Sequence, residues 1–222
     1  MRKSAIISLA VLPLLFLLAS CGTTKGLAYE KMYDEKPLVM LVMPPINNST
    51  AADAKDYFYT TMNAPIAEHG YYVLPPLSTM AVMQRESAYD SELFIDGDLS
   101  RFKTLFNADV AVFTIIKSWT KVISQVTVRI EYIFKSTTTN EILFHHDANI
   151  TVDYSNQNGG LFGLLIASLS TALTDYITVA RMCNNTALAD LPYGKYHPMF
   201  DSDSGETAKS KKIFTKVKNV TY

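Results

Sequence analysis

The feature that most constrains this chain is its N-terminal segment. Arg2 and Lys3 precede an apolar run from Ala5 to Leu18, and small residues then lead to Cys21. Positive charge, apolar run and small residues in this order are typical of a secretory signal peptide. The run is shorter than the ~20 residues that a membrane-spanning helix needs. We therefore predict that residues 1–20 are an export signal and that the mature protein begins at Cys21.

The end of this segment predicts a lipid anchor. The tetrapeptide Leu18-Ala-Ser-Cys21 resembles the bacterial lipobox, in which the cysteine thiol is acylated before cleavage. The alternative is a short buried helix ending in an ordinary cysteine, which the ordered signal-peptide pattern disfavours. Several acyl chains hold a protein stably, whereas one is marginal. Gly22 stands where enteric lipoproteins of the inner membrane carry an aspartate, so we expect the outer membrane. We expect Cys21 to be lipidated, from the lipobox, and the domain to face the periplasm, an orientation that these residues do not determine.

Charge and cysteine content exclude other classes of protein. The chain has 20 Lys and Arg against 21 Asp and Glu, a balance that does not favour nucleic-acid binding. It has two cysteines. If Cys21 is lipidated, Cys183 has no partner within the chain. A buried thiol at Cys183 is favoured over an intermolecular bridge.

The rest of the chain divides into three parts by composition. Residues 21–36 are polar and contain glycine, which predicts a flexible lipidated tether. Residues 37–190 carry the periodic apolar patterns of a single α/β domain. Residues 191–222 are rich in Pro, Gly, Ser and Lys, so we expect an exposed, partly disordered tail.

The first half of the domain alternates strand and helix patterns. Residues 37–43 form an apolar run that ends at two prolines, as a buried strand does, and 71–74 predict a second strand. Near-helical spacing predicts helices over 51–69 and 77–88, and a shorter one over 98–106. This βαβα order favours a layered sheet covered by helices.

The second half predicts three consecutive strands. Alternating apolar residues mark 110–116, 121–134 and 141–154, with short connections at 118–120 and 136–140. Short connections favour an antiparallel meander. Residues 161–177 then predict an apolar helix, for which burial in the core is favoured over facing a partner or lipid. The fold class is therefore α/β (α+β), with the sheet in two or three layers.

No motif for catalysis is present. The sequence lacks the nucleophile elbow, the P-loop, the zinc-protease motif and the dinucleotide-binding glycines. His145 and His146 are adjacent on a predicted strand, so their side chains point to opposite faces and cannot share a metal ion. We predict no catalytic residue, no metal site and no cofactor, and we expect the protein not to be an enzyme.

Two segments are candidates for binding a partner. The first follows the apolar strand at 37–43, where α/β sheets commonly bind ligands, although a turn with a helix N-cap is the favoured explanation. The second joins amides and glycines to the start of the apolar helix, a composition that suits close backbone approach, a hinge, or a simple helix entry. The candidate residues are Asn47, Asn48, Ser49, Asn156, Asn158, Gly159, Gly160, Leu161, Leu164 and Leu165.

Several sequence blocks together resemble one family. They are Val42-Met-Pro-Pro45 with Asn48 and Ser49, Ala67-Glu-His-Gly-Tyr-Tyr-Val73 with Pro75, Asn107-Ala-Asp109, and Asn156-Gln-Asn-Gly-Gly-Leu161 with Gly163-Leu-Leu165. On these blocks the chain is similar to Gram-negative lipoproteins of unknown function, typified by a meningococcal surface-antigen candidate. The resemblance implies a fold like those of CsgG, the TolB N-terminal domain and LpoB. The lysine-rich segment after Phe200 departs from the family pattern.

The resemblance also implies how the protein acts. CsgG-like proteins and LpoB work through partners, so we expect an accessory subunit of an outer-membrane secretion or assembly complex with a CsgG-like lipoprotein as partner. An LpoB-like activator of a peptidoglycan synthase is the alternative, and an unrecognised hydrolase is the least favoured. A homodimer fits each of these.

Overall fold

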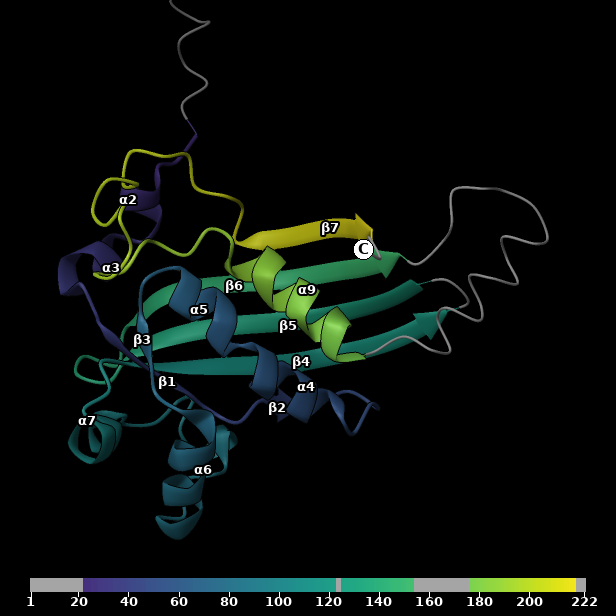
Figure 1. Ribbon diagram of the computed structural model, residues 1–222, viewed down its shortest axis with the longest axis horizontal. Coiled ribbons are helices and arrows are strands. Elements are labelled where there is room, and N and C mark those ends of the chain that lie inside the picture. The colour runs from purple at the N-terminus through teal and green to yellow at the C-terminus, as the bar shows by residue number, and fades with distance from the viewer. Residues whose placement is uncertain (1–21, 123–124, 154–175, 219–222) are drawn as a thin grey trace, which may run out of the picture.

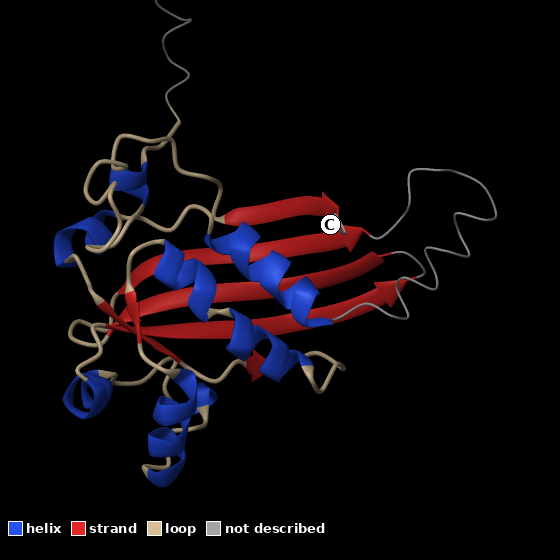
Figure 2. Ribbon diagram, in the orientation of Figure 1, coloured by secondary structure: helices blue, strands red, loops and turns tan. Residues whose placement is uncertain are grey.

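A computed structural model describes residues 22–122, 125–153 and 176–218. Within this part of the chain, one seven-stranded sheet runs in the order β3-β1-β4-β5-β6-β7, and β2 pairs with β4 beside β1 (Figure 1). Helices lie over the sheet and at its lower edge (Figure 2). The fold is mixed α/β, as the sequence predicts.

The parallel part of the sheet comes from the first half of the chain. β1 (Val39–Val42) pairs with both β3 (Tyr72–Val73) and β4 (Val110–Val122) in parallel, and β2 (Ile46–Asn47) also runs parallel to β4. The strands predicted at 37–43 and 71–74 are therefore confirmed. Such parallel pairs need helical crossovers between the strands.

The helices of this half follow the predicted order. They are α4 (Ala54–Thr61), α5 (Asn63–Glu68), α6 (Pro76–Arg85) and α7 (Ser100–Phe106), with a 3₁₀ turn η1 (Ser91–Leu93) before α7. The single helix predicted over 51–69 is wrong in one respect, because it is split at Met62. Pro65 lacks the N–H that would bond to the carbonyl of Thr61, and its ring crowds that carbonyl.

The antiparallel meander is confirmed, with its first strand longer than predicted. β5 (Gln125–Ser136) pairs antiparallel with β4 and with β6 (Ile142–Asp153). The connection predicted at 118–120 is wrong, because β4 continues to Val122 and shifts register between Ile116 and Ser118. Trp119 lies opposite Val128, and its ring packs edge-on against Phe58. This aromatic packing keeps the segment in the sheet.

Alternating residues of the parallel strands enter two separate cores. Met40, Val42 and Val112 belong to the larger core, which includes α4, α5 and α9 (Tyr176–Leu188). Leu41 and Phe113 point the other way, into a smaller core with side chains of α6 and α7. The fold therefore has three layers around β1 and the start of β4, with the sheet between two layers of helices. Over β5 and β6 the larger core lies on one face only, so the predictions of two and three layers each hold for part of the molecule.

The predicted tether at 22–36 is wrong as a description of this segment. It forms two short helices, α2 (Lys25–Ala28) and α3 (Glu30–Glu35). Tyr29 and Met32 are each only 2% exposed and belong to the larger core. Their three-residue spacing places both on one side of the helical segment, and burying them holds it against the domain.

The predicted disordered tail is also wrong for the residues described. Leu191 and Asp203 are fully buried, and β7 (Lys212–Lys218) pairs in parallel with β6. Exposed and half-buried side chains alternate along β7. Lysines at the exposed positions are a common protection of an edge strand, so lysine content does not indicate disorder here.

The apolar helix predicted over 161–177 lies almost wholly outside the described residues. Tyr176 and Ile177 begin α9, which continues to Leu188. α9 packs against α4 and lies over β5 and β6 (Figure 1). Cys183 is a free, fully buried thiol of α9, as predicted, and burial raises its pKa to about 12. No helix among the residues that the structure describes is long and apolar enough to cross a membrane.

Candidate partner-binding site

The first predicted binding segment forms a tight turn after β2. The Asn47 carboxamide oxygen accepts hydrogen bonds from the Ser49 backbone N–H at 3.1 Å and from its hydroxyl at 2.7 Å. The Asn47 amide nitrogen donates to the Ala51 carbonyl at 2.8 Å. Asn47 and Ser49 thus use their side chains within the turn. Asn48 lies between them with its side chain exposed, so it is the member of the trio that faces outward.

Asn48 lines a groove, which we call the isoleucine groove. Its volume is about 320 Å³. Five isoleucines come from separate segments: β2, the loop after η1, β4, β5 and β6. The lining residues are Ile46, Asn48, Glu92, Ile95, Asp96, Ile115, Ile133, Lys135 and Ile142.

The groove is open on the side of β6. Ile142 is 51% exposed at the start of that strand. Ile115 and Ile133 are half-buried on the face of the sheet opposite α9, where their neighbours along the strands are charged, such as Lys117 and Glu131. Exposed aliphatic surface gathered in a hollow is typical of a binding site.

The rim of the groove is acidic. Glu92 and Asp96 are exposed, and a hydrogen bond with Asp90 together with partial burial raises the pKa of Glu92. The single lysine of the groove, Lys135, donates from Nζ to the Ile95 carbonyl at 2.6 Å. That bond fixes the ammonium group at the wall. The groove therefore offers apolar surface bordered by carboxylates.

The second predicted segment cannot be placed. Asn156, Asn158, Gly159, Gly160, Leu161, Leu164 and Leu165 lie outside the described residues, and so does Cys21.

One buried set of side chains has the composition of a catalytic triad. His146 Nδ1 donates to the Ala187 carbonyl, and the single proton of the Tyr29 hydroxyl lies between two acceptors, His146 Nε2 and the Asp190 carboxylate, each 2.7 Å from the hydroxyl oxygen. The three side chains are at most 2% exposed, so a substrate cannot reach them. Burial lowers the pKa of His146, which favours the neutral imidazole. The set connects the start of α3, β6 and the residues after α9 as a structural link.

The two adjacent histidines, His145 and His146, lie in different environments. His145 Nε2 bonds to the Glu131 carboxylate at 2.7 Å on the face away from α9, whereas His146 is in the larger core beside Phe144. They point to opposite faces of β6, as predicted. Among the described residues, no group of three or more His, Cys, Asp or Glu is arranged to hold a metal ion.

Sequence reasoning missed the isoleucines. The available signal was an aliphatic residue at an outward position of an alternating strand, as at Ile115 and Ile133. One such residue is ordinary on a protein surface. Only the register of β4, β5 and β6 brings several together with Ile46 and Ile95.

The described residues define a mixed α/β domain that carries an open apolar groove with a carboxylate rim. Residues 27–190 match the sequence model of the family described as "Putative lipoprotein GNA1162-like". The chain belongs to this family. The family resemblance drawn from the sequence blocks is thereby confirmed, and the match includes α3 and the second half of α2.

The individual proteins to which this chain is similar share only a low sequence identity with it. The chain is 24% identical over 172 residues to lipoprotein NMB1124/NMB1162 of Neisseria meningitidis serogroup B, covering 72% of this chain and 78% of that protein. The crystal structure of lipoprotein GNA1162 from Neisseria meningitidis is 21% identical with a TM-score of 0.49, over 62% of this chain and 96% of that one. The LpoB C-terminal domain from Escherichia coli is 12% identical with a TM-score of 0.39, over 54% and 92%. These structural likenesses are too weak to add a functional conclusion.

Proposed function

We propose that this protein is a lipid-anchored, non-enzymatic interaction subunit of an outer-membrane secretion or assembly complex. Its family of lipoproteins supports attachment to the envelope, and the Leu18-Ala-Ser-Cys21 motif supports Cys21 as the lipidated residue. The periplasm-facing orientation and a CsgG-like lipoprotein as partner are parts of the same proposal.

The isoleucine groove is the observation that carries this proposal. Its aliphatic walls favour burial of aliphatic or aromatic side chains, and each buried methylene contributes about 0.8 kcal/mol. The Glu92 and Asp96 carboxylates favour positive charge beside them. We infer a partner segment that presents an apolar side chain flanked by Lys or Arg.

The predicted site residues have different roles in this proposal. Asn48 contributes a hydrogen-bonding amide to the groove wall, while Asn47 and Ser49 hold the turn that presents it. The segment 156–165 stays a prediction as a second contact.

The activator alternative requires reach across the periplasm. Residues 24–36 are folded onto the domain by Tyr29 and Met32, which removes most of the length that an extended tether would have supplied. This observation weighs against a long-distance activator, and nothing in the described residues favours it over a subunit that acts close to its membrane.

The experiment is affinity capture from crosslinked cells of the variant Ile142→Glu. The half-exposed position of Ile142 accepts a polar residue without disturbing the core. The new carboxylate replaces an apolar contact with a charge that must be desolvated when the partner binds. We expect recovery of the partner to fall by about tenfold, which corresponds to ~1.4 kcal/mol of binding free energy.

Leu77→Glu is the matched control. Leu77 is an 85% exposed aliphatic residue of α6 outside the groove, so its variant should recover the partner as the native chain does. Equal recovery with both variants would contradict the groove as the binding site, and recovery of no envelope protein by the native chain would contradict the proposed function itself.

A further inference from the structure

The start of the described chain is fastened beside the segment that leads to β7. The Ala208 N–H donates to the Thr23 carbonyl at 2.8 Å, and the Lys25 N–H donates to the Glu206 carbonyl at 2.8 Å. Cys21 precedes Thr23 by two residues, so its Cα lies within about 8 Å of that of Thr23. A lipid on Cys21 would therefore enter the membrane next to Ala208.

A lysine-rich segment begins directly at that point. Lys209, Lys211, Lys212 and Lys218 are exposed and have no ion pair among the residues that the structure describes. Lys216 is paired with Asp153 at 2.6 Å. β7 forms the upper edge of the sheet, on the side where the chain enters (Figure 1).

The carboxylates of the neighbouring segment are paired with lysines of the N-terminal segment. Asp203 and Glu206 both pair with Lys25, at 3.2 and 2.9 Å, and Asp201 pairs with Lys36. The two carboxylates on Lys25 leave one negative charge, which the three positive charges of Lys209, Lys211 and Lys212 exceed. Such positive charge is attracted to anionic lipid within about a Debye length.

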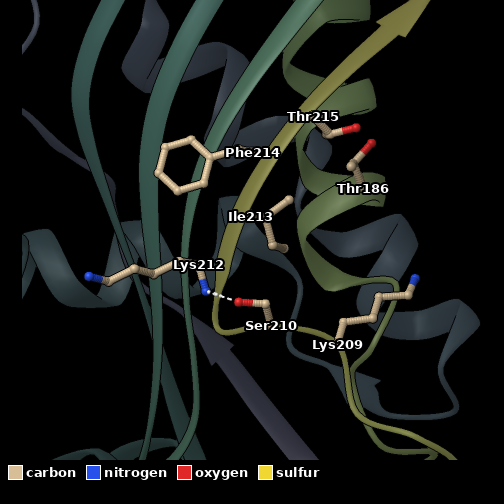
Figure 3. A pocket seen from close by; sticks show the side chains of 7 residues that line it. All are labelled: Thr186, Lys209, Ser210, Lys212, Ile213, Phe214 and Thr215. Carbon is tan, nitrogen blue, oxygen red and sulfur yellow. Dashed lines mark hydrogen bonds between the residues drawn. The ribbon is translucent and has the colours of Figure 1, made fainter. Parts of the chain in front are cut away.

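Apolar side chains are exposed on α2, near the entry of the chain, and on β7 itself. Leu27 on α2 is 73% exposed, and Phe214 on β7 is 76% exposed. Figure 3 shows Phe214 pointing away from α9, on the same side of β7 as Lys212, whereas Lys209 points to the other side. Lysines beside exposed apolar residues are typical of surfaces that lie in a membrane interface.

We propose that the domain lies directly on the membrane that holds its anchor, with Lys209, Lys211 and Lys212 contacting anionic phospholipid headgroups. This inference rests on the proposed lipidation of Cys21. Because residues 24–36 are folded, the anchor fixes which side of the domain meets the lipid. The β7 edge faces the membrane and α6, at the opposite edge in Figure 1, faces away.

The test places the mature lipidated protein in vesicles of phosphatidylcholine, with or without phosphatidylglycerol. Single labelling sites are made by Ser210→Cys or Leu77→Cys, and fluorescence energy transfer to an acceptor on lipid headgroups is measured. Cys183 is buried and does not compete for the label. We expect strong transfer from position 210 and weak transfer from position 77 in anionic vesicles.

Charge reversal then tests the lysines. The combined substitutions Lys209→Glu, Lys211→Glu and Lys212→Glu should abolish the difference between the two labels. Lys55→Glu, Arg85→Glu and Arg101→Glu together change the net charge equally on α4, α6 and α7 and should leave it intact. Equal energy transfer from both positions in every type of vesicle would overturn this inference. It would not bear on the proposed binding of a partner in the isoleucine groove. If the protein did not stay bound to neutral vesicles, the proposed lipidation of Cys21 would be contradicted, and the inference that rests on it would fail as well.

Discussion

At the scale of single residues, the blocks that mark the family hold the fold together. Gly70 has a φ of +85°, and a Cβ built on it would lie 2.3 Å from the backbone nitrogen of His197. The Gly194 N–H donates to the His69 carbonyl at 2.7 Å, and the Tyr196 N–H to the Gly70 carbonyl at 3.0 Å. The glycine in this block therefore lets the C-terminal segment approach the backbone closely.

We expect Gly70→Ala to lower the free energy of unfolding by roughly 1–3 kcal/mol. The backbone at this position is left-handed, which disfavours any side chain, and an added Cβ would be crowded. Chemical denaturation measures the change. Gly205→Ala is the control, because an added Cβ at Gly205 meets no atom within 4 Å. A Gly70 variant as stable as the control would contradict the close approach.

Asp109, in a second family block, joins three elements. Its carboxylate accepts hydrogen bonds from the Leu38 and Val39 N–H groups at 2.8 and 2.9 Å and from Lys103 Nζ at 2.6 Å. Burial opposes the charged form, but the bonds from Lys103 and the two backbone groups outweigh it and lower the pKa of Asp109. The carboxylate, which precedes β4, thus ties β1 to α7.

A lowered pKa makes this contribution dependent on pH. The stabilisation is present above the pKa of the unfolded chain, ~3.9 for Asp, and is lost as the pH falls through the lower folded value. Asp109→Asn should therefore lose more stability at pH 7 than at pH 3, measured by denaturation at each pH. Asp53→Asn, at an exposed position with no side-chain cap bond, is the control for removing a surface carboxylate. A pH-independent effect at Asp109 would show that the charge plays no part.

At the scale of elements, the spacing of apolar residues predicted those strands and helices whose formation depends on the local sequence. The strands at 39–42 and in the meander, and the helices α6 and α7, could be predicted from apolar spacing. The two errors at the ends of the domain arose where polar composition hid a few buried residues. Tyr29 and Met32 fasten α2 and α3, and Ile213 and Val217 turn toward the larger core from β7. Their contacts come from residues distant in sequence, which composition does not reveal.

The Tyr29 hydroxyl is the polar part of that fastening. Tyr29→Phe would leave His146 Nε2 and Asp190 without their shared partner in a buried place, at a cost of about 1–3 kcal/mol. We expect faster hydrogen exchange and proteolysis within residues 22–36. Tyr196→Phe, where the ring is 68% exposed, should leave both unchanged. Unaltered protection in the Tyr29 variant would mean that apolar packing alone holds the segment.

At the scale of the whole molecule, function depends on surfaces that no single segment contains. The sequence predicted Asn48 as a binding residue but not the five isoleucines beside it, because these come from four strands of the sheet and the loop after η1, which only the fold brings together. The predicted tether hid the basic edge near Cys21, since its folding is what places Ala208 beside Thr23. Together these surfaces support a domain that is held on its membrane and binds its partner through a lateral groove.

The most direct test of binding through the groove is photo-crosslinking in living cells from single positions. A photoreactive amino acid would replace Ile142 in the groove or Leu77 on α6, both exposed aliphatic residues. We expect one dominant crosslinked envelope protein from position 142 and none from position 77. The same products from both positions, or none from position 142, would contradict the groove as the site through which this protein acts.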